Sequence, residues 1–121
     1  MSRIELEDLT MEQFSAIVNG CGGEGLPQPP QFVFEEACAR HDLDYWIGAT
    51  ELDRLVADRL FLHRMAAAAW RAGGLRRIPL LWAAWAYYRA VRAFGGAFFY
   101  YGPRKRGKAD LVGWPPQGGA G

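Results

Sequence analysis

A histidine and a tyrosine lie in this chain at a spacing that suits acid and base chemistry. His41 and Tyr45 are four residues apart, and Phe34 and Cys38 continue the same stripe toward the N-terminus. On a helix this stripe would face the core, and it would carry a titratable imidazole inward. Because histidine changes its charge near neutral pH, a buried imidazole is a candidate general base.

A second apolar stripe carries a carboxylate. Asp58 lies between Leu55 and Leu62 at helical spacing. Burial of an unpaired carboxylate is costly, so Asp58 needs a hydrogen-bond donor. His41 and Tyr45 can supply N–H and O–H groups if the two helices pack face to face. The sequence therefore predicts a His41–Asp58 pair, supported by Tyr45, as a candidate active site.

The helices that would position these residues are marked by their ends. Gly48 ends a helix over about residues 32–47, and Thr50 can cap a second helix that stops near residue 72. Pro79 suits the first turn of a third long helix, over residues 78–94. A shorter amphipathic helix is predicted within residues 3–18, with Thr10 as its N-cap. Since strand-like alternation is not convincing anywhere, we predict an all-α fold whose first two long helices are antiparallel.

The third long helix is rich in aromatic residues. Trp82, Trp85, Tyr88 and Val91 recur there at helical spacing. This pattern predicts that they face the core, and aromatic residues left at the surface are candidates for contact with lipid. His63, by contrast, has no catalytic company and is predicted to face solvent.

Length and charge bound the interpretation. A chain of 121 residues, half of them apolar, is typical of one folded domain. Residues 1–60 hold twelve acidic and four basic side chains, whereas residues 61–121 hold one acidic and ten basic side chains. This asymmetry indicates an anionic partner for the second half. We expect a domain over residues 1–102 and a basic tail rich in Pro and Gly over residues 103–121.

The basic residues after position 102 have two interpretations. Arg104, Lys105 and Arg106 are either a solvated tail or a contact to anionic lipid, in which four further arginines would join. Those arginines are Arg76, Arg77, Arg89 and Arg92. Nucleic acid is not expected, because no recognised binding motif accompanies these residues.

Two cysteines and the apolar segments leave the compartment open. Cys21 and Cys38 are either a pair or two free thiols. The spacing of Cys38 and His41 would suit half of a zinc site, but no second Cys/His pair accompanies it. Neither a signal peptide nor a membrane-spanning segment is predicted. We expect a protein that is soluble or lies on a membrane surface.

The order of these residues resembles a known family. The pattern Cys38-x-x-His41-Asp42-x-x-Tyr45 is similar to the helix signature of the phospholipase A2 superfamily, and most similar to its small prokaryotic and fungal secreted branch. The motif around Asp58 resembles that branch's second active-site aspartate, and residues 84–95 resemble its last helix. The resemblance covers roughly residues 18–102.

The resemblance implies a calcium-dependent phospholipase A2, which hydrolyses the sn-2 ester of glycerophospholipids. His41 would be the general base, oriented by Asp58 and Tyr45. Calcium would be held by the carboxylate of Asp42 and by a glycine-rich loop. The loop residues implied are Asn19, Gly20 and Gly22. A Cys21–Cys38 disulfide would join that loop to the helix.

The resemblance also sets the partner and an alternative. The expected partner is a phospholipid membrane surface that is anionic, reached by secretion or by delivery to an extracellular compartment. The alternative function is a catalytically silent module of the same fold that binds a membrane or a protein. Oligomeric state, headgroup preference and acyl-chain preference are left open.

Overall fold

The chain folds into helices joined by short turns. The structure is a computed structural model, and it describes residues 4–18 and 31–115. Within those residues the named elements are α-helices and one-turn 3-10 helices, without a named strand. The predicted all-α class is therefore confirmed for the described part of the chain.

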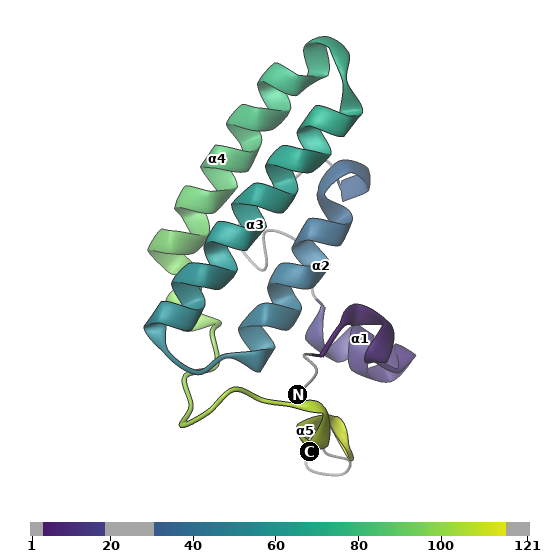
Figure 1. The fold of residues 1–121 in the computed structure, drawn as a ribbon, viewed down its shortest axis with the longest axis vertical. Helices are drawn as coiled ribbons and strands as arrows, with labels where there is room; N and C mark the ends of the chain where they lie inside the picture. The colour runs from purple at the N-terminus through teal and green to yellow at the C-terminus, as the bar shows by residue number, and fades with distance from the viewer. Residues whose placement is uncertain (1–3, 19–30, 116–121) are drawn as a thin grey trace.

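Three long helices build the body of the molecule. They are α2 (Gln31–Ile47), α3 (Glu51–Ala72) and α4 (Arg77–Phe94). Figure 1 shows them side by side, with α3 in the middle and each neighbour antiparallel to it. Their ends agree with the predicted ends to within one residue. Over residues 4–18 and 31–115, no helix combines the length and the apolar character needed to cross a bilayer.

The turn between α2 and α3 fixes their antiparallel arrangement. Gly48 ends α2 with a φ of 68°, in the left-handed region that favours glycine. A Cβ at this position would overlap the carbonyl oxygen of Tyr100. Thr50 then caps α3 in a reciprocal box, since its hydroxyl accepts from the Asp53 N–H and its own N–H donates to the Asp53 carboxylate. The N-cap of the next helix therefore lies two residues after Gly48, and α3 starts at Glu51.

The core of the three-helix layer joins the two predicted stripes. Phe34 and Cys38 of α2 pack with Phe61 and Met65 of α3. The α4 residues in this core are Leu80 and Ala84, with Tyr87 and Val91 beside them. The predicted inward faces of α2 and α3 are thus confirmed, and His63 is exposed as expected.

The predicted inward face of α4 is wrong for its two tryptophans, whereas Val91 packs beside the core as predicted. Trp82 is 70% exposed and Trp85 is 47% exposed, and Tyr88 is half-buried. The sequence pattern was ambiguous because α4 is apolar on opposite sides. The side with Leu80 and Ala84 packs on α3, where the small side chain of Ala84 allows a close approach of the two helices.

A second core lies on the other side of α2. The structure divides the predicted 3–18 helix into a one-turn helix η1 (Leu6–Asp8) and α1 (Met11–Ile17). Thr10 caps α1 as predicted, by accepting from the Gln13 N–H. The buried residues of this core are Ile4, Ile17, Leu43, Trp46, Ile47 and Leu111. Leu111 comes from the short helix α5 (Lys108–Leu111), so this core also includes the basic segment.

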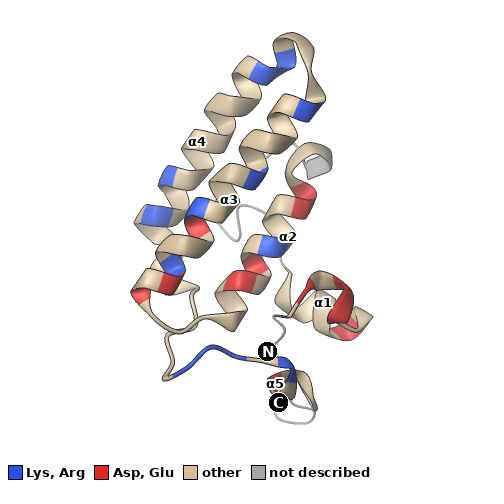
Figure 2. Ribbon diagram, viewed as in Figure 1, with Lys and Arg blue, Asp and Glu red and all other residues tan. Residues whose placement is uncertain are grey.

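The chain after α4 returns to the α2–α3 turn. It passes through the one-turn helix η3 (Gly95–Ala97), and then Ala49 N–H donates to the Tyr100 carbonyl over 2.9 Å. Further on, Arg106 N–H donates to the Ile47 carbonyl over 2.9 Å. Residues 103–115 differ from the preceding part in composition, yet they pack against it. Figure 2 shows how basic residues dominate α4 and this segment, while acidic residues lie mainly near α1, along α2 and at the start of α3.

Candidate active site

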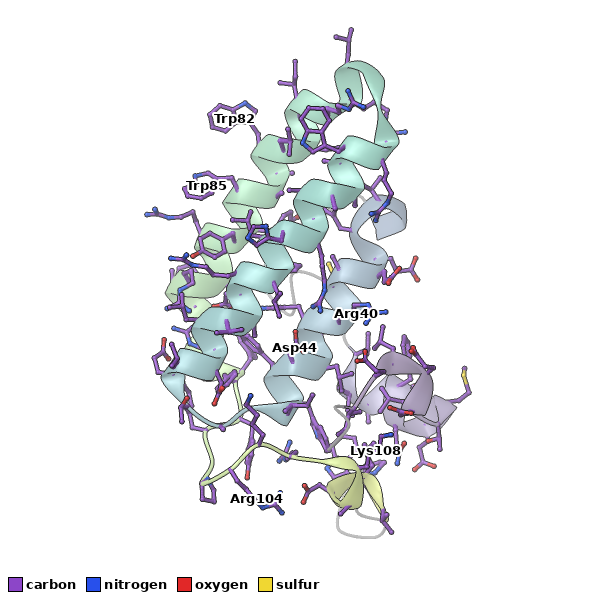
Figure 3. All side chains as sticks on the ribbon, viewed as in Figure 1. Arg40, Asp44, Trp82, Trp85, Arg104 and Lys108 are labelled. Carbon is purple, nitrogen blue, oxygen red and sulfur yellow. The ribbon has the colours of Figure 1, made fainter. Side chains whose placement is uncertain are left out.

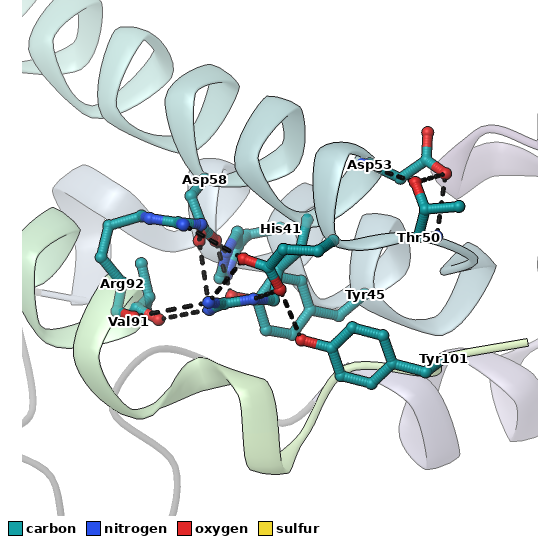
Figure 4. A network of polar contacts seen from close by, with 10 residues as sticks. His41, Tyr45, Thr50, Asp53, Asp58, Val91, Arg92 and Tyr101 are labelled. Atoms are coloured by element: carbon teal, nitrogen blue, oxygen red, sulfur yellow. Dashed lines mark hydrogen bonds and ion pairs between the residues drawn. The ribbon is translucent and has the colours of Figure 1, made fainter.

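The pair predicted from the two stripes is present in the structure. His41 Nε2 lies 2.8 Å from Asp58 Oδ1, and the Tyr45 hydroxyl donates to the same oxygen over 2.6 Å (Figure 4). The antiparallel packing of α2 and α3 brings the three side chains together across 17 residues of sequence. All three are buried, and Asp58 has no exposed surface.

The contacts of His41 settle its tautomer. An ionised carboxylate accepts hydrogen bonds and cannot donate them, so Nε2 must carry the proton that faces Asp58. A neutral ring then has its lone pair on Nδ1. The ring stacks on Phe61 with 4.2 Å between centroids and 18° between planes. The stacking on Phe61 and the hydrogen bond to Asp58 together fix the orientation of the imidazole ring, and so the position of Nδ1.

Tyr45 is held by its own packing. Its ring meets Phe99 edge to face, with 5.1 Å between centroids. Its hydroxyl lies against Gly95 at the end of α4, where a Cβ would overlap the hydroxyl oxygen. The glycine therefore leaves room for the hydroxyl to reach Asp58.

Two arginines that the sequence analysis did not assign to the site hold the other oxygen of Asp58. Arg92 of α4 donates to Asp58 Oδ2 over 2.7 Å, and Arg54 Nη1 lies 3.6 Å from the same oxygen. Arg92 is one of the arginines that the lipid interpretation would include. Its guanidinium binds Asp58 and Glu51, and its contact with lipid stays a prediction. The contact of Arg54 with Asp58 could have been predicted, since Arg54 lies one helical turn before Asp58. The contact of Arg92 could not, because Arg92 belongs to another helix.

An exposed carboxylate completes this network. Glu51 accepts from Arg54 Nε over 2.9 Å and from Arg92 Nη2 over 3.2 Å. It also accepts from the Tyr101 hydroxyl over 2.7 Å. The arginines and Tyr101 lower the pKa of Glu51 to about 2. The network thus runs from the surface at Glu51 to the buried His41.

The buried groups are shifted toward the protonation states that base catalysis needs. Burial lowers the pKa of His41 below its usual value, although the hydrogen bond to Asp58 acts in the opposite direction. Burial acts to raise the pKa of Asp58, but hydrogen bonds from His41, Tyr45 and Arg92 outweigh it and lower that pKa. Burial also raises the pKa of Tyr45. At neutral pH the site therefore holds a neutral imidazole, an ionised aspartate and a protonated tyrosine.

The predicted calcium ligands are described only in part. Asp42 is half-buried on α2, next to His41 in sequence. Asn19, Gly20 and Gly22 lie outside the described residues, as does Cys21, the expected partner of Cys38. Within residues 4–18 and 31–115, no group of three or more His, Cys, Asp or Glu side chains is arranged to hold an ion. A site made of one carboxylate and backbone carbonyls would still suit calcium, so the calcium site and the disulfide stay predictions.

The three basic residues predicted to touch a membrane have partners within the chain. Arg104 forms two hydrogen bonds with Asp110, of 3.0 and 3.1 Å, and Lys105 lies 3.4 Å from Asp53. Arg106 stacks its guanidinium on the ring of Tyr100. Arg104 and Lys105 remain exposed, so their contact with lipid stays a prediction. Figure 3 shows Arg104 at the end of the molecule away from the α3–α4 turn.

A large open cavity lies beside this basic segment. Its volume is about 960 Å³, and residues 104–110 form one side of it. Its other lining residues include Ile47 of α2 and Val56 and Leu60 of α3. His41 and Asp58 do not line this cavity, so we assign the candidate chemistry from the side-chain geometry and not from the cavity.

Comparisons of the chain with protein-family models, with curated proteins and with solved structures found no match. The likeness to the phospholipase A2 superfamily therefore rests on the motifs in the sequence. The His41–Asp58–Tyr45 geometry is the structural feature from which a function can be inferred.

Proposed function

We propose that the protein is a phospholipase A2, which uses His41 as the general base in hydrolysis of the sn-2 ester of a glycerophospholipid. The observation that carries the proposal is the buried hydrogen bond of 2.8 Å between His41 Nε2 and Asp58 Oδ1. His41 belongs to the α2 motif, Cys38-x-x-His41-Asp42-x-x-Tyr45, that resembles the phospholipase A2 signature. The finer fold assignment, a phospholipase A2-like arrangement of two catalytic helices, belongs to the same proposal.

The first chemical step follows from the tautomer. Water attacks the ester carbonyl carbon while Nδ1 of His41 takes a proton from that water. The imidazolium that forms is stabilised by Asp58 through the proton on Nε2. Asp58 is held ionised for this purpose by Arg92 and Tyr45. The carbonyl carbon then has four substituents, and its oxygen carries the negative charge.

The second step reverses the proton transfer. The tetrahedral intermediate collapses, and the bond from the carbonyl carbon to the sn-2 oxygen breaks. His41 Nδ1 returns the proton to the leaving oxygen, so the products are a fatty acid and a lysophospholipid. Calcium, when bound by Asp42 and the loop residues, would polarise the ester carbonyl and offset the charge on its oxygen.

Substitution of the base tests the assignment. We expect His41→Gln to lower fatty-acid release from phospholipid vesicles by at least about 10², as for loss of a general base. Glutamine retains an N–H that can face Asp58, so the fold should persist, which circular dichroism can check. The matched control is His63→Gln, because His63 is exposed and should not affect release.

Near-normal release by His41→Gln would reject the mechanism. If the wild type released no fatty acid and yet bound the vesicles, the silent membrane-binding module would replace the enzyme. The two results are separated by running sedimentation and hydrolysis on the same vesicles.

A further inference from the structure

The helix α4 has an apolar side that no described part of the chain covers. Ile78 is 59% exposed, Trp82 70% and Trp85 47%, and all three lie on one stripe of the helix. Figure 3 shows the side chains of Trp82 and Trp85 extending away from the three-helix layer. We call the residues Ile78, Trp82, Trp85 and Arg89 the α4 outer face.

The apolar surface continues around the turn from α3 to α4. Leu75 in this turn is 85% exposed, and Trp70 near the end of α3 is 56% exposed. Single exposed apolar residues are normal, but a group of this size at one end of a molecule indicates an interaction surface. A helix that is apolar on opposite sides is expected to be covered on both. Among residues 4–18 and 31–115, α3 covers one side of α4, and the other side is exposed.

The charge around this surface points to an anionic partner. Between Asp58 and Asp110 the sequence contains no acidic residue. Arg71, Arg76 and Arg89 are exposed near the apolar residues. Two arginines also stack on the tryptophans, since the Arg77 guanidinium lies 4.3 Å from the Trp70 ring centroid and the Arg89 guanidinium lies 5.9 Å from that of Trp85. A second copy of the chain would oppose these arginines with arginines, so self-association is disfavoured.

We propose that the α4 outer face and the α3–α4 turn dock on an anionic membrane surface, with α4 lying along that surface. Tryptophan favours the headgroup boundary, and arginine can bind lipid phosphate. The opposite side of α4 packs on α3, so the helix can meet lipid only along its length. The choice of lipid over a protein partner rests on the proposed function. This surface is distinct from Arg104–Arg106, which pack at the opposite end.

The test measures binding without hydrolysis. The probes are sedimented vesicles of ether-linked phosphatidylglycerol or phosphatidylcholine, which have no acyl ester to cleave. We expect the wild type to bind the phosphatidylglycerol vesicles more tightly. The Ile78→Ser/Trp82→Ser variant should bind them at least about tenfold more weakly, because two exposed side chains no longer enter the interface. The matched control is Leu52→Ser/Val112→Ser, since Leu52 and Val112 are 68% and 84% exposed elsewhere.

A second measurement locates the contact. Brominated phosphatidylglycerol quenches tryptophan fluorescence at short range, so wild-type emission should fall on binding. The Trp70→Phe/Trp82→Phe/Trp85→Phe variant, which lacks the three exposed tryptophans of the proposed surface, should lose most of this quenching while still binding. Retained quenching would contradict the proposal, as would equal binding by the wild type and Ile78→Ser/Trp82→Ser.

The proposed docking surface and the proposed enzyme can fail separately. Hydrolysis of a dispersed short-chain phospholipid requires His41 but no membrane. Binding to ether-lipid vesicles requires the α4 outer face but no catalysis. The proposal would be overturned if the wild type bound no vesicles but formed a dimer, and if Ile78→Ser/Trp82→Ser were a monomer. A second copy of the chain would then be the partner that covers the α4 outer face.

Discussion

Asp58 is the residue on which the candidate site depends. It is fully buried, and both of its oxygens are engaged, Oδ1 by His41 and Tyr45 and Oδ2 by Arg92. Arg92 adds positive charge beside the carboxylate, so it keeps Asp58 ionised but also opposes a positive charge on His41. We regard Arg92 as a positioning residue, since it acts on His41 through Asp58.

Removal of this arginine should move the titration of the pair. In Arg92→Met less positive charge surrounds His41, so imidazolium formation becomes easier and the pKa of the His41–Asp58 pair rises. The neutral imidazole is the base, so the fall in hydrolysis on the acid side should begin at a higher pH than in the wild type. An NMR titration of the His41 ring protons measures the shift, and Arg92→Lys, which keeps the charge, should shift less. An unchanged His41 titration in Arg92→Met would show that Arg92 does not tune the pair.

The sequence predicted three residues of the cluster at Asp58 and missed the others. His41, Tyr45 and Asp58 were identifiable because polar groups within apolar stripes need partners. Arg92 was not, because its contact with Asp58 depends on how far α4 is shifted along α3. The stacking of Phe61 on His41 was not predicted, because it depends on side-chain packing that spacing does not specify.

The helix ends were the most predictable part of the elements. Gly48, Thr50 and Gly73 mark boundaries through local backbone chemistry, and the structure places the boundaries there. The inward face of α4 was not predictable in this way. Both sides of α4 carry large apolar residues, so their spacing alone did not show which side packs on α3, and the structure places Leu80 and Ala84 there.

The end of α4 offers a test of how an element supports the site. Gly95→Ala would push a methyl group against the Tyr45 hydroxyl and displace it from Asp58. We expect a loss of about 1–3 kcal/mol in the free energy of unfolding and a lower rate of hydrolysis. The loss should shrink in a Tyr45→Phe background, where the hydroxyl is already absent. Urea unfolding measures the loss of stability in the wild-type and Tyr45→Phe backgrounds. Gly107→Ala is the control, because a Cβ there meets nothing within 4 Å. Equal losses in the two backgrounds would contradict the close contact.

At the scale of the whole molecule, the composition of the segment after residue 102 did not predict how that segment packs. Residues 103–121 look like a tail in sequence, yet Leu111 is buried with Ile4 and Trp46, and Gln13 donates to the Leu111 carbonyl over 2.8 Å. Composition reports solubility and charge, and it cannot report a contact made across 98 residues of sequence. The segment joins the two ends of the described chain.

Calcium is the whole-molecule prediction that extends beyond the described residues. If Asp42 supplies the carboxylate of the site, Asp42→Asn should weaken calcium binding by at least about tenfold, since it removes a charged ligand. Isothermal titration of calcium into the wild type and the variant measures the change. Asp53→Asn is the control, because Asp53 caps α3 and is not a proposed ligand. An unchanged titration in Asp42→Asn would remove Asp42 from the site.

The position of bond cleavage tests the central claim most directly. Phosphatidylglycerol vesicles would carry a labelled acyl chain at either sn-1 or sn-2, and free fatty acid would be measured with calcium and with a chelator. We expect labelled fatty acid from the sn-2 position alone, and only in the presence of calcium. Release from sn-1, or release that persists with the chelator, would contradict a calcium-dependent phospholipase A2.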